Sequence, residues 1–176
     1  RNSMKNKLNP LAISAIALGG AAAAGVAAVY GITEFFVDVA VEKKPPKLYA
    51  GLVHNMSGEG LTDRRQSKLD KQAQAAQKMA DTPMEDVTAT SVDGLELKGR
   101  YYKCQNPKRI IICCHGWRSS AGVDFGLAMD FLHDSGCDVL YINQRAQNGS
   151  SGDHMGFGAM ERYDCQTWVN WVNDHT

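Results

Sequence analysis

The stretch Arg109-Ile110-Ile111-Ile112-Cys113-Cys114-His115-Gly116-Trp117 decides the fold of the second half of this chain. From Ile110 to Cys114 the run is continuously apolar, which is the pattern of a β-strand buried on both faces. The pair His115-Gly116 follows at once and favours a sharp turn, with amide hydrogens pointing beyond the strand. In open α/β sheets, ligands bind beyond the carboxyl ends of the strands, so we expect a site here.

The sequence around this strand alternates between strand and helix patterns. Asp93-Gly94 is a tight-turn pair, and Gly136 is placed to end a helix. The predicted elements are, in order, a strand over 86–91, its hairpin partner over 95–103, the strand over 109–114, a helix over 125–133, a buried strand over 138–143 and a helix over 159–173. This order predicts an α/β fold with a parallel sheet and right-handed crossovers.

The loop after the second buried strand contains Asn148-Gly149-Ser150-Ser151-Gly152. It comes close to the Gly-x-Ser-x-Gly pattern of a serine nucleophile, but neither serine has both glycines. A nucleophile elbow also passes from strand to helix in a very tight turn, and this loop is much longer. We therefore interpret it as a structural loop in which Asn148 and Gly149 adopt left-handed backbone conformations.

Other polar residues near the strand ends favour structural roles. Arg145 leaves a buried strand, and we expect it to pair with Glu161 or Asp164 rather than with substrate. Ser119 or Ser120 suits the N-cap of the helix that follows. Trp168 and Trp171 on the last helix are typical of a core.

Four motifs, in the same order and spacing, resemble the α/β-hydrolase superfamily. They are Ser91-Val92-Asp93-Gly94-Leu95-Glu96-Leu97, then Ile111-Ile112-Cys113-Cys114-His115-Gly116-Trp117, then Asn143-Gln144-Arg145-Ala146 through Ser150 and Gly152, then Gly158-x-x-Glu161-Arg162-Tyr163-Asp164. More closely, they resemble bacterial membrane-anchored serine hydrolases of the serine-aminopeptidase-like branch. The resemblance covers about half of the chain and implies the N-terminal part of an α/β-hydrolase fold, a β-hairpin followed by β-α-β-α.

The resemblance also implies site residues. In that family the loop after this strand builds the oxyanion hole, so the backbone N–H of Trp117 would donate to the oxyanion, while His115 and Gly116 shape the loop. The nucleophile lies on the next strand, with the acid and base further on. The resemblance therefore places the Ser-His-Asp triad beyond Thr176 and implies a small-molecule or peptide substrate.

The N-terminal part contains an uncharged segment over 11–33. Its length as a helix is about 35 Å, enough to cross a hydrocarbon core of about 30 Å. A cleaved signal peptide has a shorter apolar region, although Ala22-Ala23-Ala24 could serve as a cleavage site, and we favour an uncleaved signal anchor in the membrane.

Charges around that segment predict its orientation. Lys5 and Lys7 precede it, whereas Glu34, Asp38 and Glu42 follow it. Because basic residues stay in the cytoplasm, we expect residues 1–10 to be cytoplasmic. The protein would then be a single-pass protein of the cell membrane with its C-terminal domain extracytoplasmic.

Residues 34–85 are predicted to connect the anchor with the truncated hydrolase domain over 86–176. Pro45-Pro46 ends the apolar segment, and the stretch 62–80 is polar and helix-prone with a thin apolar stripe. This predicts a surface helix that ends before Pro83 and either spaces the domain from the membrane or packs on its edge.

Composition excludes several function classes. Nineteen basic and nineteen acidic residues give a net charge of zero, which argues against a nucleic-acid partner. Neither a metal nor another cofactor is predicted, because no Cys-x-x-Cys pair exists and His54, His133 and His154 have no metal-site spacing. The odd number and irregular spacing of the cysteines argue against a disulfide framework, and most of them are predicted to be small buried residues: Cys104, Cys113, Cys114, Cys137 and Cys165.

Two functions remain open. The first is a membrane-anchored serine hydrolase acting on an ester or peptide bond, present here as an incomplete chain. The second is a naturally short, non-catalytic half-domain that acts as an interaction module. An enzyme using Cys113, Cys114 and His115 for thiol or metal chemistry is disfavoured, because successive strand residues point to opposite faces.

Overall fold

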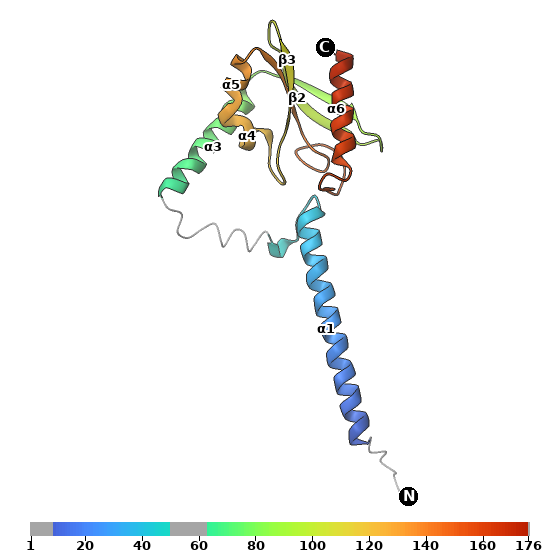
Figure 1. The fold of residues 1–176 in the computed structure, drawn as a ribbon. Coiled ribbons are helices and arrows are strands. Elements are labelled where there is room, and N and C mark those ends of the chain that lie inside the picture. The colour runs from blue at the N-terminus through green and yellow to red at the C-terminus, as the bar shows by residue number, and fades with distance from the viewer. Residues whose placement is uncertain (1–8, 50–62, 176) are drawn as a thin grey trace, which may run out of the picture.

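The computed structural model describes residues 9–49 and 63–175 (Figure 1). Lys5, Lys7 and the part of the connector over 50–62 lie outside the described residues. The named elements are α1 (Pro10–Val41), α3 (Asp63–Asp81), β1 (Glu85–Thr90), β2 (Glu96–Tyr102), β3 (Arg109–Cys114), α4 (Ala121–Phe125), the 3-10 turn η1 (Gly126–Ala128), α5 (Met129–Asp134), β4 (Cys137–Ile142) and α6 (Glu161–His175). The predicted α/β class and the order of hairpin, strand, helix, strand and helix are confirmed.

The sheet is mixed, so the prediction of a parallel sheet is wrong in part. Its strand order is β1-β2-β4-β3. β3 and β4 are parallel, with Ile111 opposite Val139. The hairpin instead joins the sheet through β2, which is antiparallel to β4 and places Tyr101 opposite Leu140. The two strands of a hairpin run in opposite directions, so the direction of its contact with the parallel pair depends on which of them joins the sheet, and here it is β2.

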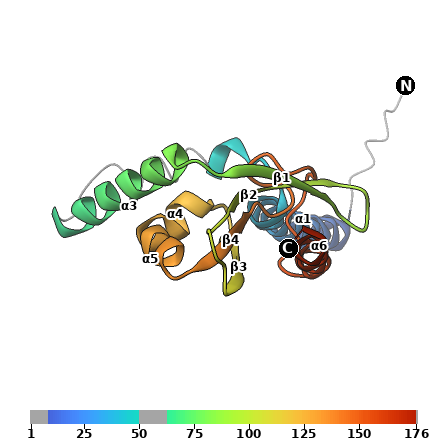
Figure 2. The same ribbon diagram turned by 90° about the horizontal axis from the view of Figure 1, so that it is seen from above.

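β4 is the central strand, and all of its residues are buried. Val139 and Tyr141 face one layer of helices, while Leu140 and Ile142 face the other. Figure 2 shows these layers, with α3, α4 and α5 on one side of the sheet and α6 on the other. The continuous apolar pattern therefore reports two covered faces, as expected for a strand inside a three-layer fold.

Trp168 of α6 fills the core on its side of the sheet and is fully buried. It lies over Gly99 of β2, where an added Cβ would be 3.3 Å from the indole ring. Leu97, Tyr101 and Val172 complete the same cluster. The prediction that Trp168 belongs to the core is confirmed.

The helical segment between β3 and β4 differs from the prediction of one helix over 125–133. It begins earlier, at Ala121, and consists of α4, η1 and α5 in succession. Ser120 caps α4, as one of the two predicted candidates, by accepting the Val123 N–H at 3.4 Å. The break falls at Gly126, a poor helix former, where α3 crosses so closely that no side chain fits.

α3 packs against these short helices and contributes to the core. Met79 is buried beside Cys113 and Met129. Arg100 reinforces the junction by donating to the carbonyl oxygens of Met79 at 3.0 Å and Thr82 at 2.9 Å. Of the two roles considered for this helix, packing on the domain is the one observed.

α1 is one continuous helix that runs past Thr33, the predicted end of the anchor, to Val41. Within the described residues it is the one helix whose length and composition suit a membrane span, over Gly20–Val41 with a mean hydropathy of 1.6. Most of that span is exposed, with Val39 near its end buried, and Figure 1 shows the helix projecting from the domain. Length and composition alone make it a candidate span.

The Gly126 contact yields a stability prediction. A Cβ at Gly126 would lie 2.9 Å from backbone atoms of Ala75, while the glycine φ of −54° is one that alanine adopts freely. Gly126→Ala should therefore destabilise the domain by about 1–3 kcal/mol through overpacking alone. Urea unfolding followed by tryptophan fluorescence measures this, with exposed Gln166→Ala in α6 as the control. A Gly126→Ala protein as stable as the parent would contradict the packing of α3 on α4.

Candidate functional site

His115 joins the two loops at the carboxyl ends of β3 and β4. Its side chain is buried, and Nε2 accepts hydrogen bonds from the Gln144 N–H at 3.3 Å and the Asn148 side-chain amide at 3.1 Å. Nδ1 lies 2.9 Å from the Gly116 carbonyl oxygen. Because Nε2 accepts twice, Nδ1 carries the proton and donates to that carbonyl. His115 is thus a fully engaged neutral imidazole that connects the loops.

The turn after β3 is held by a carboxylate. Asp124 accepts the Gly116 N–H at 2.6 Å and the Ser119 hydroxyl at 2.7 Å. The Gly116 amide beside Asp124 holds the pKa of that carboxyl below its usual range. The loop therefore has a fixed shape although Gly116 and Trp117 are themselves exposed.

Trp117 presents its backbone N–H at the end of β3 without a hydrogen-bond partner among the described residues. The next residue, Arg118, has a positive φ of 49°, so the chain turns sharply immediately after this amide. An unpaired amide held by a fixed turn is the type of donor that stabilises a developing oxyanion.

A hollow of about 280 Å³ adjoins this turn. The loop after β3 and the loop before α6 line it, through His115, Trp117, Met155, Phe157 and Glu161 among others. Gln147 also lines it, and its buried Oε1 has no hydrogen-bond partner within the described residues. A larger hollow of about 620 Å³ lies between the β1–β2 hairpin and α6, away from the strand ends, so we place the candidate site in the smaller one.

Ser150 has a structural role. It is fully buried, donates to the Asn143 carbonyl oxygen at 2.8 Å and accepts the Lys98 N–H at 2.9 Å. A hydroxyl enclosed in this way is inaccessible to substrate. The loop interpretation is confirmed, and Asn148 and Gly149 have the predicted positive φ angles, 47° and 94°.

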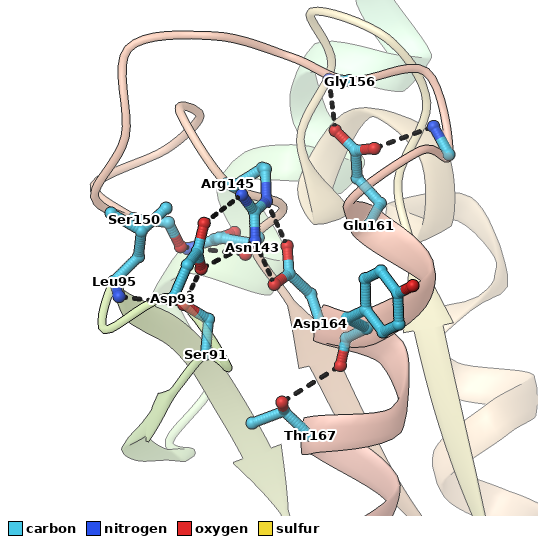
Figure 3. Close-up of polar contacts among 12 residues, drawn as sticks. Ser91, Asp93, Leu95, Asn143, Arg145, Ser150, Gly156, Glu161, Asp164 and Thr167 are labelled. Atoms are coloured by element: carbon cyan, nitrogen blue, oxygen red, sulfur yellow. Dashed lines mark hydrogen bonds and ion pairs between the residues drawn. The ribbon is translucent and has the colours of Figure 1, made fainter.

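Arg145 forms the most buried ion pair of the described residues (Figure 3). Its Nε and Nη2 donate to the two carboxylate oxygens of Asp164, each at 2.7 Å, and its Nη1 donates to Asp93 at 2.9 Å. Pairing with Asp164 was one of two predicted alternatives and is confirmed. The β4 loop, the hairpin turn and α6 are thereby joined at one guanidinium.

The other alternative, Glu161, has a different role. It accepts the backbone N–H groups of Gly156 at 2.6 Å and Gly158 at 2.7 Å (Figure 3). Burial alone would raise the pKa of Glu161, but these amide hydrogen bonds outweigh it, and the net shift is downward. Glu161 therefore closes the loop that leads into α6 and lines the candidate hollow.

The thiols near the site are poor nucleophiles. Cys113 is buried, and burial raises the pKa of its thiol to about 11. Burial also raises the pKa of Cys114, and the neighbouring Cys165 adds to the shift. Thiol chemistry at neutral pH needs a lowered pKa, so neither Cys113 nor Cys114 supports such chemistry.

Within residues 9–49 and 63–175, no group of three or more His, Cys, Asp or Glu side chains is arranged to hold a metal ion.

Three contacts of this site could not be expected from the sequence. The Trp117 indole Nε1 donates to the Ala40 carbonyl oxygen at 2.9 Å, and Arg118 donates to the Val39 carbonyl oxygen at 2.8 Å. Asp124 holds the Gly116 amide. These partners are close only in space, and no spacing pattern in the chain indicates them.

The fold is that of the N-terminal part of an α/β-hydrolase-type domain. No protein-family model and no curated protein matches the chain. Among solved structures, it is similar to an esterase from Pyrococcus furiosus, with 27% identity, a TM-score of 0.50 and coverage of 56% of this chain and 39% of that one. An α/β hydrolase from Novosphingobium aromaticivorans matches at 24% identity and a TM-score of 0.40, covering 51% of this chain and 32% of that one.

A third match is an esterase from Exiguobacterium antarcticum, at 14% identity and a TM-score of 0.43, covering 51% of this chain and 32% of that one. The chain thus spans less than two-fifths of the length of these structures. The solved structures it resembles are hydrolases and esterases of the α/β fold.

The buried ion pair yields a stability prediction. Arg145→Ala leaves Asp164 buried without its cation, which should cost about 3–5 kcal/mol. Arg162→Ala, which removes an exposed arginine of α6, the helix that contains Asp164, should change stability by about 0.5 kcal/mol or less. Near-ultraviolet circular dichroism during a thermal melt measures both, and equal losses would contradict the bracing role of Arg145.

The same pair predicts a pH dependence. The Arg145 guanidinium lowers the pKa of Asp93 to about 2 from an ordinary value of 3.8. Its contribution to stability is present above the ordinary value and is lost as the pH falls through about 2. Asp93→Asn should reduce stability at pH 5 and flatten its decline between about pH 4 and 2. A mutant with the parental pH profile would show that Asp93 does not contribute.

Proposed function

We propose that this chain is the N-terminal part of a membrane-anchored serine hydrolase that cleaves an ester or a peptide bond. The observation that carries the proposal is the unpaired Trp117 N–H at the end of β3, fixed beside a hollow in an α/β-hydrolase-type fold. Likeness to an esterase at 27% identity supports the ester-hydrolase class. The resemblance to the serine-aminopeptidase-like branch supports the anchored form and the alternative of a peptide bond.

In the proposed mechanism, Trp117 N–H donates to the oxyanion of a tetrahedral intermediate of acyl transfer. His115 does not act as the base, because both of its ring nitrogens are engaged with the two loops. It holds the turn so that the Trp117 amide stays in place, and Gly116 is held by Asp124. The Ser-His-Asp triad belongs, in this proposal, to residues that follow Thr176.

The proposal also places the protein in the cell membrane, with α1 as a single span and the domain outside the cytoplasm. Lys5 and Lys7 before the helix support that orientation. Lys43, Lys44 and Lys47 follow the helix, and by the same rule they favour the opposite orientation. Because basic residues flank both ends, orientation is best measured directly. Proteinase added to intact spheroplasts should digest residues after α1, while protection of the domain until lysis would reverse the orientation.

Ser150 gives a first test against a rival nucleophile. Ser150→Ala removes the acceptor for the Lys98 N–H, which should cost about 1–3 kcal/mol of stability. Hydrolysis of p-nitrophenyl acetate by the 176-residue chain should remain at background before and after the change. A burst of p-nitrophenol from the parent chain that Ser150→Ala abolishes would contradict the placement of the nucleophile outside these residues.

Trp117 gives the test of the oxyanion donor, in a longer chain that carries the nucleophile. Trp117→Pro removes the amide hydrogen and should lower kcat by about 10²–10³-fold. Trp117→Ala is the matched control, since it removes the indole and its bond to Ala40 but keeps the amide. Equal loss of kcat in both variants would show that the side chain matters and the amide does not.

A further inference from the structure

The last carbonyl groups of α1 are bound by the loop that follows β3. The final four carbonyl oxygens of an α-helix lack partners within the helix and need other donors. Trp117 donates its indole N–H to Ala40, and Arg118 donates to Val39 at 2.8 Å and to Glu42 at 2.5 Å. The positive charge of Arg118 also suits the negative end of the helix dipole. The end of α1 is therefore fixed to the turn that carries the candidate oxyanion donor.

The loop after β4 holds the same helix end from another side. Met155 donates its N–H to the Val41 carbonyl oxygen, and Lys43 donates its N–H to Asp153, both at 2.7 Å. His154 Nε2 lies 2.8 Å from a carboxylate oxygen of Glu42. With backbone and side-chain bonds on both sides, α1 cannot swing freely, and the strand-end loops lie toward the helix that would enter the bilayer (Figure 1).

Apolar side chains remain exposed at this junction. On α1, Phe36 is 64% exposed and Val37 49% exposed. On the loops beside it, Trp117 is 45% exposed and Phe157 65% exposed, and both line the candidate hollow. Tryptophan is enriched at the level of lipid headgroups, and an exposed phenylalanine adds apolar surface beside it. Exposed apolar side chains are thus present both on the proposed span and on the rim of the hollow.

The length of the candidate span fits a bilayer at this level, and the span includes two carboxylates, Glu34 and Asp38, near its end. The candidate span Gly20–Val41 has 22 residues and would be about 33 Å long, close to a hydrocarbon core of about 30 Å. Its end at Val41 is where the loops bind. Exposed Lys44 and Lys47 follow it and would lie at the level of the lipid headgroups, while Lys43 donates to the carbonyl oxygens of Ser150 and Gly152.

We propose that this end of the domain rests on the bilayer surface, with Trp117 and Phe157 in contact with lipid at the rim of the hollow. The inference rests on the membrane anchoring in the proposed function and adds a docking face to it. If the core edge lay instead at Thr33, the eight residues to Val41 would lift the loops by about 12 Å, beyond contact with acyl chains. The two positions are distinguishable by experiment.

The test uses the 176-residue chain in vesicles of phosphatidylcholine and phosphatidylglycerol. Vesicle flotation reports anchoring, and quenching by phosphatidylcholine brominated near the top of its acyl chains reports contact of tryptophan with lipid. Trp117 is one of three tryptophans, and the others, Trp168 and Trp171, lie in or against the core on α6. We expect flotation together with bromine quenching that Trp117→Phe removes and Trp171→Phe leaves in place.

Trp117→Phe also removes the hydrogen bond between the indole and the Ala40 carbonyl oxygen, so a second variant tests lipid contact separately. In the Trp117→Phe background, Phe157→Trp should restore the quenching, because residue 157 lies on the same rim. Flotation without quenching of Trp117 would overturn the docking face and leave the anchor standing. Quenching that persists in Trp117→Phe would also overturn it. Failure to float would overturn the proposed anchoring itself.

Discussion

A guanidinium group that leaves water needs partners for its donors and for its charge, and Arg145 obtains them from two carboxylates. Its side chain is only 6% exposed, and Asp164 beside it is 5% exposed. Asp164 belongs to α6, Asp93 to the hairpin turn, and Arg145 to the loop after β4 (Figure 3). Elements distant in sequence therefore have one relative position in which this charge is satisfied, and the rest of the strand-end structure is built on that position.

The candidate site depends on the same arrangement. With the β4 loop fixed, Gln144 and Asn148 present donors to His115 Nε2, and His115 in turn holds the turn after β3. Asp124 completes that turn through the Gly116 amide. The Trp117 N–H lies between the Gly116 amide, which Asp124 accepts, and the Ser119 amide, which donates to the Gly116 carbonyl oxygen. A donor held in a turn fixed in this way is preorganised.

The parts of this structure that were predicted from the sequence are those encoded by short-range patterns. The strand over Ile110–Cys114, the Asp93-Gly94 turn and the left-handed Asn148-Gly149 pair each reflect local chemistry, and each was found where predicted. The prediction that this strand is buried on both faces was wrong, because β3 is the edge strand of the described sheet and only its Cys113 is buried. The sheet was predicted as parallel because the pattern of a hairpin does not state which strand it joins. The broken helix at Gly126 and the contacts of Trp117 with Ala40 depend on residues that meet only in the folded chain.

The end of α1 connects the two halves of the chain. A helix ending in water would leave its last carbonyl groups to solvent. Here Trp117 and Arg118 donate to them and so tie α1 to the candidate oxyanion loop. Displacement of the end of α1 would disturb the loop after β3, because Trp117 and Arg118 belong to that loop and donate to the helix end. In a domain resting on the bilayer as proposed, the hollow would face lipid rather than bulk water. A hydrolase site in that position would meet molecules held at the membrane surface before those free in solution.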